Sequence, residues 1–202
     1  FMSDMNLNEN LSSTPQDRRE LMDLVERMQG AFTTIAKSKI PTIALAHGFC
    51  IGGATSLVSA CDIRLATKDA KFSIGETKLG LVADVGVLQR MPKIVSSGDI
   101  NELALTGRIF DGEHAEKIRF VSKAYENSDE LFEAGEKLAN EISSNSKRIV
   151  QATKEALEKS SNLTVDQGLE YAKLWSTSFL VSEDLREGVM AFLEKRDPKF
   201  NE

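Results

Sequence analysis

The sequence predicts an α/β protein whose last third is entirely helical. Three patterns predict this fold class: short apolar runs with β-branched residues in the first half, a glycine loop between two of them, and apolar residues at helical spacing from Ser128 onwards. The 202 residues are 41% hydrophobic and 28% charged, an ordinary globular composition with length for one core. We therefore expect a core at residues 1–127 and a helical region at residues 128–202.

The predicted strands lie in the first half of the chain. Apolar residues from Leu21 to Ile35 first predict a helix, which ends before Pro41 because the residue preceding a proline is pushed out of the helical region. Residues 42–46 then predict a strand buried on both faces. We expect next a loop at 47–53, a helix at 54–60, strands at 63–66 and 71–74, helices at 87–94, 100–106 and 112–117, and a short strand at 121–125. Strand, loop, helix and strand form a βαβ unit, so the first two strands should pair in parallel.

The last third of the chain contains only helical patterns. Its apolar stripes run through residues 131–142, 149–157 and 169–179, and a final amphipathic helix covers 185–195. We expect this helical region to pack on the core or on another subunit.

Composition and charge exclude several classes of protein. The net charge of −6, from 25 basic and 31 acidic residues, disfavours a nucleic-acid partner, since a phosphate backbone rewards clustered positive charge. A membrane partner is also not expected, because no apolar run approaches the ~20 residues that span a bilayer. Cys50 and Cys61 lie in apolar sequence, which predicts buried thiols in a reduced compartment. The sequence contains no cluster of cysteine and histidine residues, so we expect no metal site.

The glycine loop is the first candidate site. Gly52 and Gly53 close the loop before the helix at 54–60, and two consecutive glycines allow a ligand to approach the backbone closely. The first N–H groups of a helix have no internal acceptor, so they can bind an anion or stabilise an oxyanion. The alternative interpretation is a tight turn from strand to helix.

Two carboxylates form the second candidate site. Glu76 follows the predicted strand at 71–74, and Asp84 is the only acid in the apolar stretch 79–88. A buried pair of carboxyl groups suits proton transfer, because one can hold a proton while the other acts as a base. The alternatives are a solvated strand end for Glu76 and a helix N-cap for Asp84.

Several segments together resemble the crotonase (enoyl-CoA hydratase/isomerase) superfamily. Residues 41–53 are similar to its core strand and oxyanion loop, and residues 72–81 to its F-x-x-x-E-x-x-x-G segment. The other matching segments are 60–66, 88–92, 105–108, 121–123 and 184–195. The likeness covers nearly the whole chain in the right order and spacing.

The resemblance implies a fold, a substrate and an assembly. The fold is a spiral of ββα turns with a helical C-terminal trimerisation region, and its N-terminal strands are expected to be missing from this chain. The substrate is an acyl-CoA thioester, so no cofactor is expected beyond the coenzyme A that the substrate carries. The assembly is a homotrimer or a hexamer made of two trimers. We expect a cytoplasmic protein, with mitochondrial targeting left open because the N-terminus appears incomplete.

The resemblance also implies roles for residues at the site. Two backbone N–H groups hold the thioester oxygen, one on Gly53 and one on Met5, which lies in a segment similar to F-x-x-G-x-D-L. This segment departs from the family pattern, with Asp4 for glycine and Asn6 for aspartate. The expected substrate-binding residues are Ser3, Gly52 and Ser56.

Three positions indicate which reaction of the superfamily to expect. Ser56 replaces one of the two glutamates that hold water in hydratases, and a serine is no base without an activating partner. Glu76 and Asp84 occupy the positions of two acids in dienoyl-CoA isomerases, which convert 3,5-dienoyl-CoA to 2,4-dienoyl-CoA. The alternatives are a 3-enoyl-CoA to 2-enoyl-CoA isomerase that uses Glu76 alone, a hydratase-like enzyme, and a binding subunit without catalysis.

Overall fold

The computed structural model describes residues 15–200, apart from the side chain of Asp17. Its residues form two compact units. The first contains the described residues up to Ser38 together with Thr42–Glu133, and the second contains Lys39–Pro41 together with the described residues from Ala134. The predicted division of the chain at residue 127 into a core and an oligomerisation region stays a prediction.

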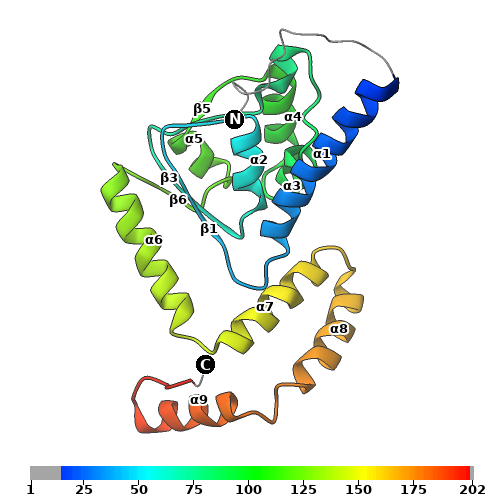
Figure 1. Cartoon of the computed structure of the whole chain (residues 1–202). Coiled ribbons are helices and arrows are strands. Elements are labelled where there is room, and N and C mark those ends of the chain that lie inside the picture. Colours follow the sequence, from blue (N-terminus) through cyan, green and yellow to red (C-terminus); the bar gives the residue numbers. More distant parts are fainter. Residues whose placement is uncertain (1–14, 201–202) are drawn as a thin grey trace. The chain divides into compact units, whose positions relative to one another are not determined.

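Two three-stranded sheets form the framework of the first unit (Figure 1). One sheet is parallel throughout, in the order β1 (Ile43–Ala46), β3 (Ile63–Thr67) and β6 (Lys123–Tyr125). In the other sheet β4 (Lys71–Ser73) lies between β2 (Phe49–Ile51) and β5 (Phe110–Asp111), parallel to β2 and antiparallel to β5. The predicted parallel pairing of the first two strands is confirmed, with Ile43 opposite Ile63.

Helices and short 3₁₀ turns connect these strands. The described helices of the first unit are α1 (Pro15–Ala36), α2 (Gly53–Ala60), α3 (Val87–Arg90), α4 (Ser97–Thr106) and α5 (Gly112–Lys117), with 3₁₀ turns η1 (Gly75–Leu79) and η2 (Met91–Lys93). Local chemistry fixes their ends: the Ser96 hydroxyl accepts a hydrogen bond from the Asp99 amide, and the Asp111 carboxylate accepts one from the His114 amide. The helices predicted at 54–60, 100–106 and 112–117 are confirmed.

Aromatic and aliphatic side chains fill the core between the second sheet and the helices. Phe72 on β4 is fully buried, and its ring centroid lies 5.5 Å from that of Phe110 and 5.5 Å from that of Phe120. Ile74 and Met91 extend the same cluster. Each such side chain contributes about 1.5–3 kcal/mol by leaving water, so this cluster holds the segments on either side of η1 in place.

The second unit is helical, as the sequence predicts. Its helices are α7 (Lys147–Ser160), α8 (Val165–Thr177) and α9 (Glu183–Glu194), and it also contains most of α6 (Ser128–Ser143). The indole N–H of Trp175 on α8 donates to the Ala152 carbonyl on α7 at 3.0 Å, and the Trp175 ring stacks on Tyr171. Trp175 therefore joins α7 to α8.

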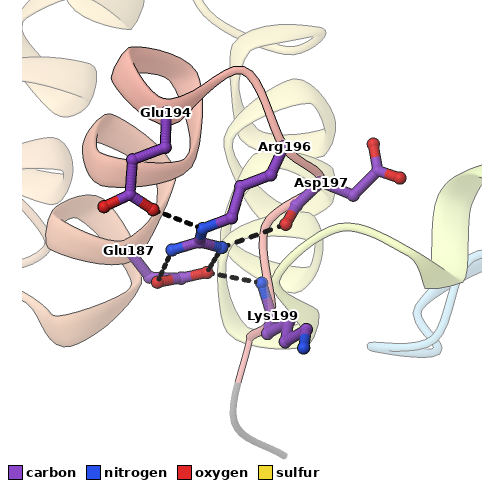
Figure 2. Close-up of polar contacts among 5 residues, drawn as sticks. All are labelled: Glu187, Glu194, Arg196, Asp197 and Lys199. Carbon is purple, nitrogen blue, oxygen red and sulfur yellow. Dashed lines mark hydrogen bonds and ion pairs between the residues drawn. The ribbon is translucent and has the colours of Figure 1, made fainter.

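Ion pairs and hydrogen bonds join the end of α9 to the residues that follow it (Figure 2). This cluster, called the latch below, consists of Glu187, Glu194, Arg196 and Lys199. Lys195 adopts a left-handed conformation with φ 53°, which turns the chain back along the helix. The guanidinium of Arg196 then donates two hydrogen bonds to the Glu187 carboxylate, at 2.6 and 3.0 Å, and one to Glu194 at 2.6 Å. The Lys199 amide also donates to Glu187, at 2.7 Å. The Arg196 side chain and the Lys199 amide together lower the pKa of Glu187 to about 2.

Some expectations differ from the structure. The predicted loop at 47–53 contains β2, whose three residues are too few to show a strand period in the sequence. The helix predicted at 87–94 ends at Arg90 and continues as η2, because Pro92 cannot donate a hydrogen bond inside a helix. Cys50 is buried, which raises the pKa of its thiol to about 11, but Cys61 is only partly buried.

Candidate active site

The glycine loop holds a backbone conformation that only glycine adopts readily. Gly52 precedes α2 with φ 58° and ψ −117°, outside the regions open to residues with a Cβ atom. Its amide donates to the Ser73 carbonyl on β4 at 2.9 Å, and the Thr55 hydroxyl contacts the carbonyls of Cys50 and Ser73. The loop is thus fastened to both β2 and β4.

Gly53 is the first residue of α2, and its amide has no acceptor among the described residues. The N–H groups of a first helical turn carry partial positive charge and have no partner within the helix. This amide can therefore stabilise a developing negative charge on a ligand oxygen. The predicted second N–H group, on Met5, and the predicted substrate-binding residue Ser3 lie outside the described residues.

Glu76 lies directly beside the glycine loop. It is the second residue of η1, just after β4, and its Oε1 atom would lie 3.3 Å from a Cβ atom placed on Gly52. Its other carboxylate oxygen, Oε2, is buried and has no hydrogen-bond partner among the described residues. A buried charged oxygen without a partner costs several kcal/mol or more in an apolar medium, so proteins rarely keep one without a functional reason. The structure therefore brings Glu76 together with Gly52 and Gly53, where a ligand or a proton would meet it.

Ser56 lies one turn into α2. Its amide donates to the Gly52 carbonyl at 3.1 Å, its side chain is fully buried, and its hydroxyl oxygen has no hydrogen-bond partner among the described residues. Within residues 15–200, the buried side-chain oxygens without a partner are those of Ser56, Glu76 and Thr67. Two of the three belong to residues that the sequence predicted for the site.

Asp84 differs from its expectation. Its apolar sequence neighbours suggested a buried carboxylate, but its side chain is exposed, whereas Ala83 and Val85 on either side are buried. Burial alternates along residues 83–85, and Asp84 falls on the solvent side. No hydrogen bond or ion pair joins Asp84 to Glu76 among the described residues.

Two side chains hold the segment that carries Asp84 by hydrogen bonds to its backbone carbonyls. The Gln29 side-chain amide on α1 donates to the Asp84 carbonyl at 2.6 Å, and Arg90 on α3 donates to the Val85 carbonyl at 3.3 Å. Sequence reasoning missed both contacts. Nothing in a single sequence indicates the hydrogen bond between Gln29 and Asp84, which lie 55 positions apart, or the bend that brings Arg90 to Val85, five positions away.

The stretch of chain between the two acids carries exposed apolar side chains. Leu79, Leu81 and Val82 lie between Glu76 and Asp84, and their exposed fractions are 62%, 50% and 78%. Such a surface suits an apolar ligand or another protein surface. In the part of the chain that the structure describes, no group of three or more Asp, Glu, His or Cys side chains could hold a metal ion. No described helix is long and apolar enough to cross a bilayer.

Comparison with known proteins shows the family of this chain. The model of the enoyl-CoA hydratase/isomerase family matches residues 3–202, nearly the whole chain. The chain therefore belongs to the enoyl-CoA hydratase/isomerase family, within the crotonase superfamily that its sequence resembles.

Two relatives of this chain are named for the same activity. The chain is 47% identical to the mitochondrial Delta(3,5)-Delta(2,4)-dienoyl-CoA isomerase of Dictyostelium discoideum, over 93% of this chain and 64% of that protein. It is 42% identical to the peroxisomal Delta(3,5)-Delta(2,4)-dienoyl-CoA isomerase of Arabidopsis thaliana, over 94% of this chain and 69% of that protein. The chain thus spans about two thirds of the length of these relatives.

The fold also matches solved structures. The crystal structure of enoyl-CoA hydratase from Bacillus anthracis aligns with a TM-score of 0.84 at 28% identity, over 90% of this chain and 70% of that chain. The crotonase-like fold predicted from the sequence, with a helical C-terminal region, is therefore confirmed.

Proposed function

We propose that this chain acts as an isomerase that converts 3,5-dienoyl-CoA to 2,4-dienoyl-CoA. The observation that carries the proposal is the Glu76 carboxylate, which lies against the glycine loop with one buried oxygen unpartnered. The position of this acid beside the first amide of α2 suits removal of a proton next to a thioester whose oxygen that amide holds. The two dienoyl-CoA isomerases named above support this choice of reaction among those of the family.

The proposed reaction divides the work between two acids and one backbone amide. One of Glu76 and Asp84 takes a proton near the thioester, and the other returns a proton further along the acyl chain. The Gly53 amide stabilises the negative charge on the thioester oxygen of the dienolate between these steps. Proton transfer of this kind uses no cofactor beyond the coenzyme A of the substrate.

The exposure of Asp84 favours a second candidate, a 3-enoyl-CoA to 2-enoyl-CoA isomerase. That reaction can run on Glu76 alone, and an exposed carboxylate is a weaker participant in proton transfer than one in a closed pocket. Hydration is less favoured, because Ser56 offers a hydroxyl where a second carboxylate would hold the water.

The assembly and location follow the same proposal. We propose a homotrimer or a hexamer, supported by exposed apolar side chains on the helices of the second unit. They include Leu169, Leu174, Phe192 and Leu193. The relatives carry mitochondrial and peroxisomal names, which do not support the cytoplasmic location expected from the sequence. We therefore propose that the protein works in an organelle that oxidises fatty acids.

Two variants test the proposed division of labour. Asp84→Asn and Glu76→Gln each remove one acid at nearly constant shape, and both should lower turnover of 3,5-dienoyl-CoA by about 10²–10⁴-fold, as expected for loss of a general acid or base. Asp69→Asn, at an exposed turn, is the matched control and should retain full turnover. Full dienoyl turnover by Asp84→Asn would rule out the role of this residue in the reaction. Turnover of 3-enoyl-CoA without turnover of 3,5-dienoyl-CoA by the unmodified chain would support the second candidate.

A further inference from the structure

We propose that Gln29 on α1 is a positioning residue for Asp84, an inference that rests on the proposed function. An exposed carboxylate on an irregular segment has many rotamers and backbone positions open to it. For Asp84 to take or return a proton at one carbon of the substrate, the segment that carries it must be fixed. The structure supplies three contacts that do so, and each acts on Asp84 or Val85.

The first contact is the hydrogen bond from Gln29. Its side-chain amide donates to the Asp84 carbonyl at 2.6 Å, the only described contact that α1 makes with the polar backbone of Asp84 itself. Gln29 lies in a 22-residue helix, so its backbone is rigid and the direction of this hydrogen bond is well determined.

The second contact comes from Arg90 on α3. Its guanidinium donates to the Val85 carbonyl at 3.3 Å and to the Thr33 hydroxyl on α1 at 3.2 Å. Gly86 makes room for this side chain: its φ is 117°, and a Cβ atom at this position would overlap the guanidinium. Arg90 thus joins the segment to the same helix, one turn from Gln29.

The third contact is apolar. The side chain of Val85 is buried in a small cluster with Phe32 of α1 and Ala60 of α2. The helix that begins at Gly53 and the helix that carries Gln29 therefore hold Val85 between them. Movement of α1 would shift Asp84 relative to the glycine loop, and a misplacement of about 1 Å can lower a rate by about 10²-fold.

The test compares Gln29→Met with Gln16→Met. Methionine has almost the length and the helix propensity of glutamine but donates no hydrogen bond. Gln16 lies on the same helix, and its side chain bonds only to Glu20 among the described residues. We expect Gln29→Met to lower kcat for 3,5-dienoyl-CoA by roughly 10- to 100-fold, with KM changed by less than about twofold. Gln16→Met should behave like the unmodified chain.

Two further measurements separate positioning from a structural role. In the Asp84→Asn background, Gln29→Met should cause no further loss of kcat, because Gln29 acts through Asp84. Gln29→Lys, which restores a donor of similar reach, should recover turnover that Gln29→Met has lost. Unchanged kcat in Gln29→Met, or an equal loss in both backgrounds, would overturn the inference. Full-rate isomerisation by Asp84→Asn would also overturn it, because Gln29 would then have no catalytic group to position. The proposed function fails separately, if the unmodified chain does not isomerise 3,5-dienoyl-CoA.

Discussion

At the scale of single residues, we propose that Glu76 lowers stability for the sake of function. Its Oε2 atom is buried without a partner among the described residues, and its Oε1 atom lies against the Gly52 backbone. A carboxylate in such a place is desolvated without compensation. Active sites retain such groups because the reaction supplies the missing partner.

We therefore expect Glu76→Gln, which should lower turnover by about 10²–10⁴-fold, to leave the fold as stable as before. Its free energy of unfolding should stay within about 0.5 kcal/mol of the unmodified chain or rise above it. The matched variant is Asp62→Asn, because the Asp62 carboxylate accepts hydrogen bonds from the Thr42 amide at 2.7 Å and the Thr42 hydroxyl at 2.9 Å. This second variant should lose about 1 kcal/mol. Urea unfolding checks both, and a clear loss of stability in Glu76→Gln would mean that its carboxylate is structurally paired.

Single residues also show where sequence reasoning succeeds. Gly52, Gly53 and Glu76 could be predicted because their chemistry is local: glycines next to a helix start, and an acid just after a strand. The exposure of Asp84 could not, since apolar sequence neighbours do not determine which face of an extended segment meets solvent. Gln29 could not be predicted either, because its partner lies 55 residues away.

At the scale of elements, periodicity predicts long helices well and short strands poorly. The helix found at Pro15–Ala36 and those of the last third have clear apolar stripes, and the sequence indicates all of them. β2 and β5 have three and two residues, too few for any period to appear. Their pairing with β4 depends on tertiary contacts that a single sequence does not display.

The latch after α9 makes the stability of the second unit depend on pH. The pKa of Glu187 falls from 4.5 to about 2 in the folded chain, because Arg196 and the Lys199 amide stabilise its charged form. Because the pKa of Glu187 is lower in the folded chain than in the unfolded chain, its carboxylate stabilises the folded state. This contribution is fully present above pH 4.5 and is lost as the pH falls through about 2. The latch therefore stays closed throughout the neutral range.

Thermal unfolding of Glu187→Gln checks this prediction. The variant should melt below the unmodified chain by a constant interval above about pH 5, and the two melting temperatures should converge as the pH approaches 2. Trp175 is the single tryptophan of the chain and lies in the second unit, so its fluorescence reports unfolding there. Glu158→Gln, which removes an exposed carboxylate on α7, should show no such convergence. A melting difference that persists unchanged down to pH 2 would contradict the role of the latch.

At the scale of the whole molecule, the family sets the chemistry and a few positions select the reaction. The family match covers residues 3–202, and the fold aligns with a solved enoyl-CoA hydratase at a TM-score of 0.84. A shared fold does not determine the reaction, because function depends on the residues of the site. We propose that Ser56, Glu76 and Asp84 distinguish hydration from isomerisation here, and one isomerisation from the other.

The most direct measurement of the proposed activity is a spectrophotometric assay of the full chain with three substrates in parallel. They are 3,5-dienoyl-CoA, 3-enoyl-CoA and 2-enoyl-CoA, each followed by the change in conjugation that its reaction produces. We expect rapid conversion of 3,5-dienoyl-CoA to the 2,4-dienoyl product, and little or no hydration of 2-enoyl-CoA. Rapid hydration of 2-enoyl-CoA without dienoyl isomerisation would contradict the proposal.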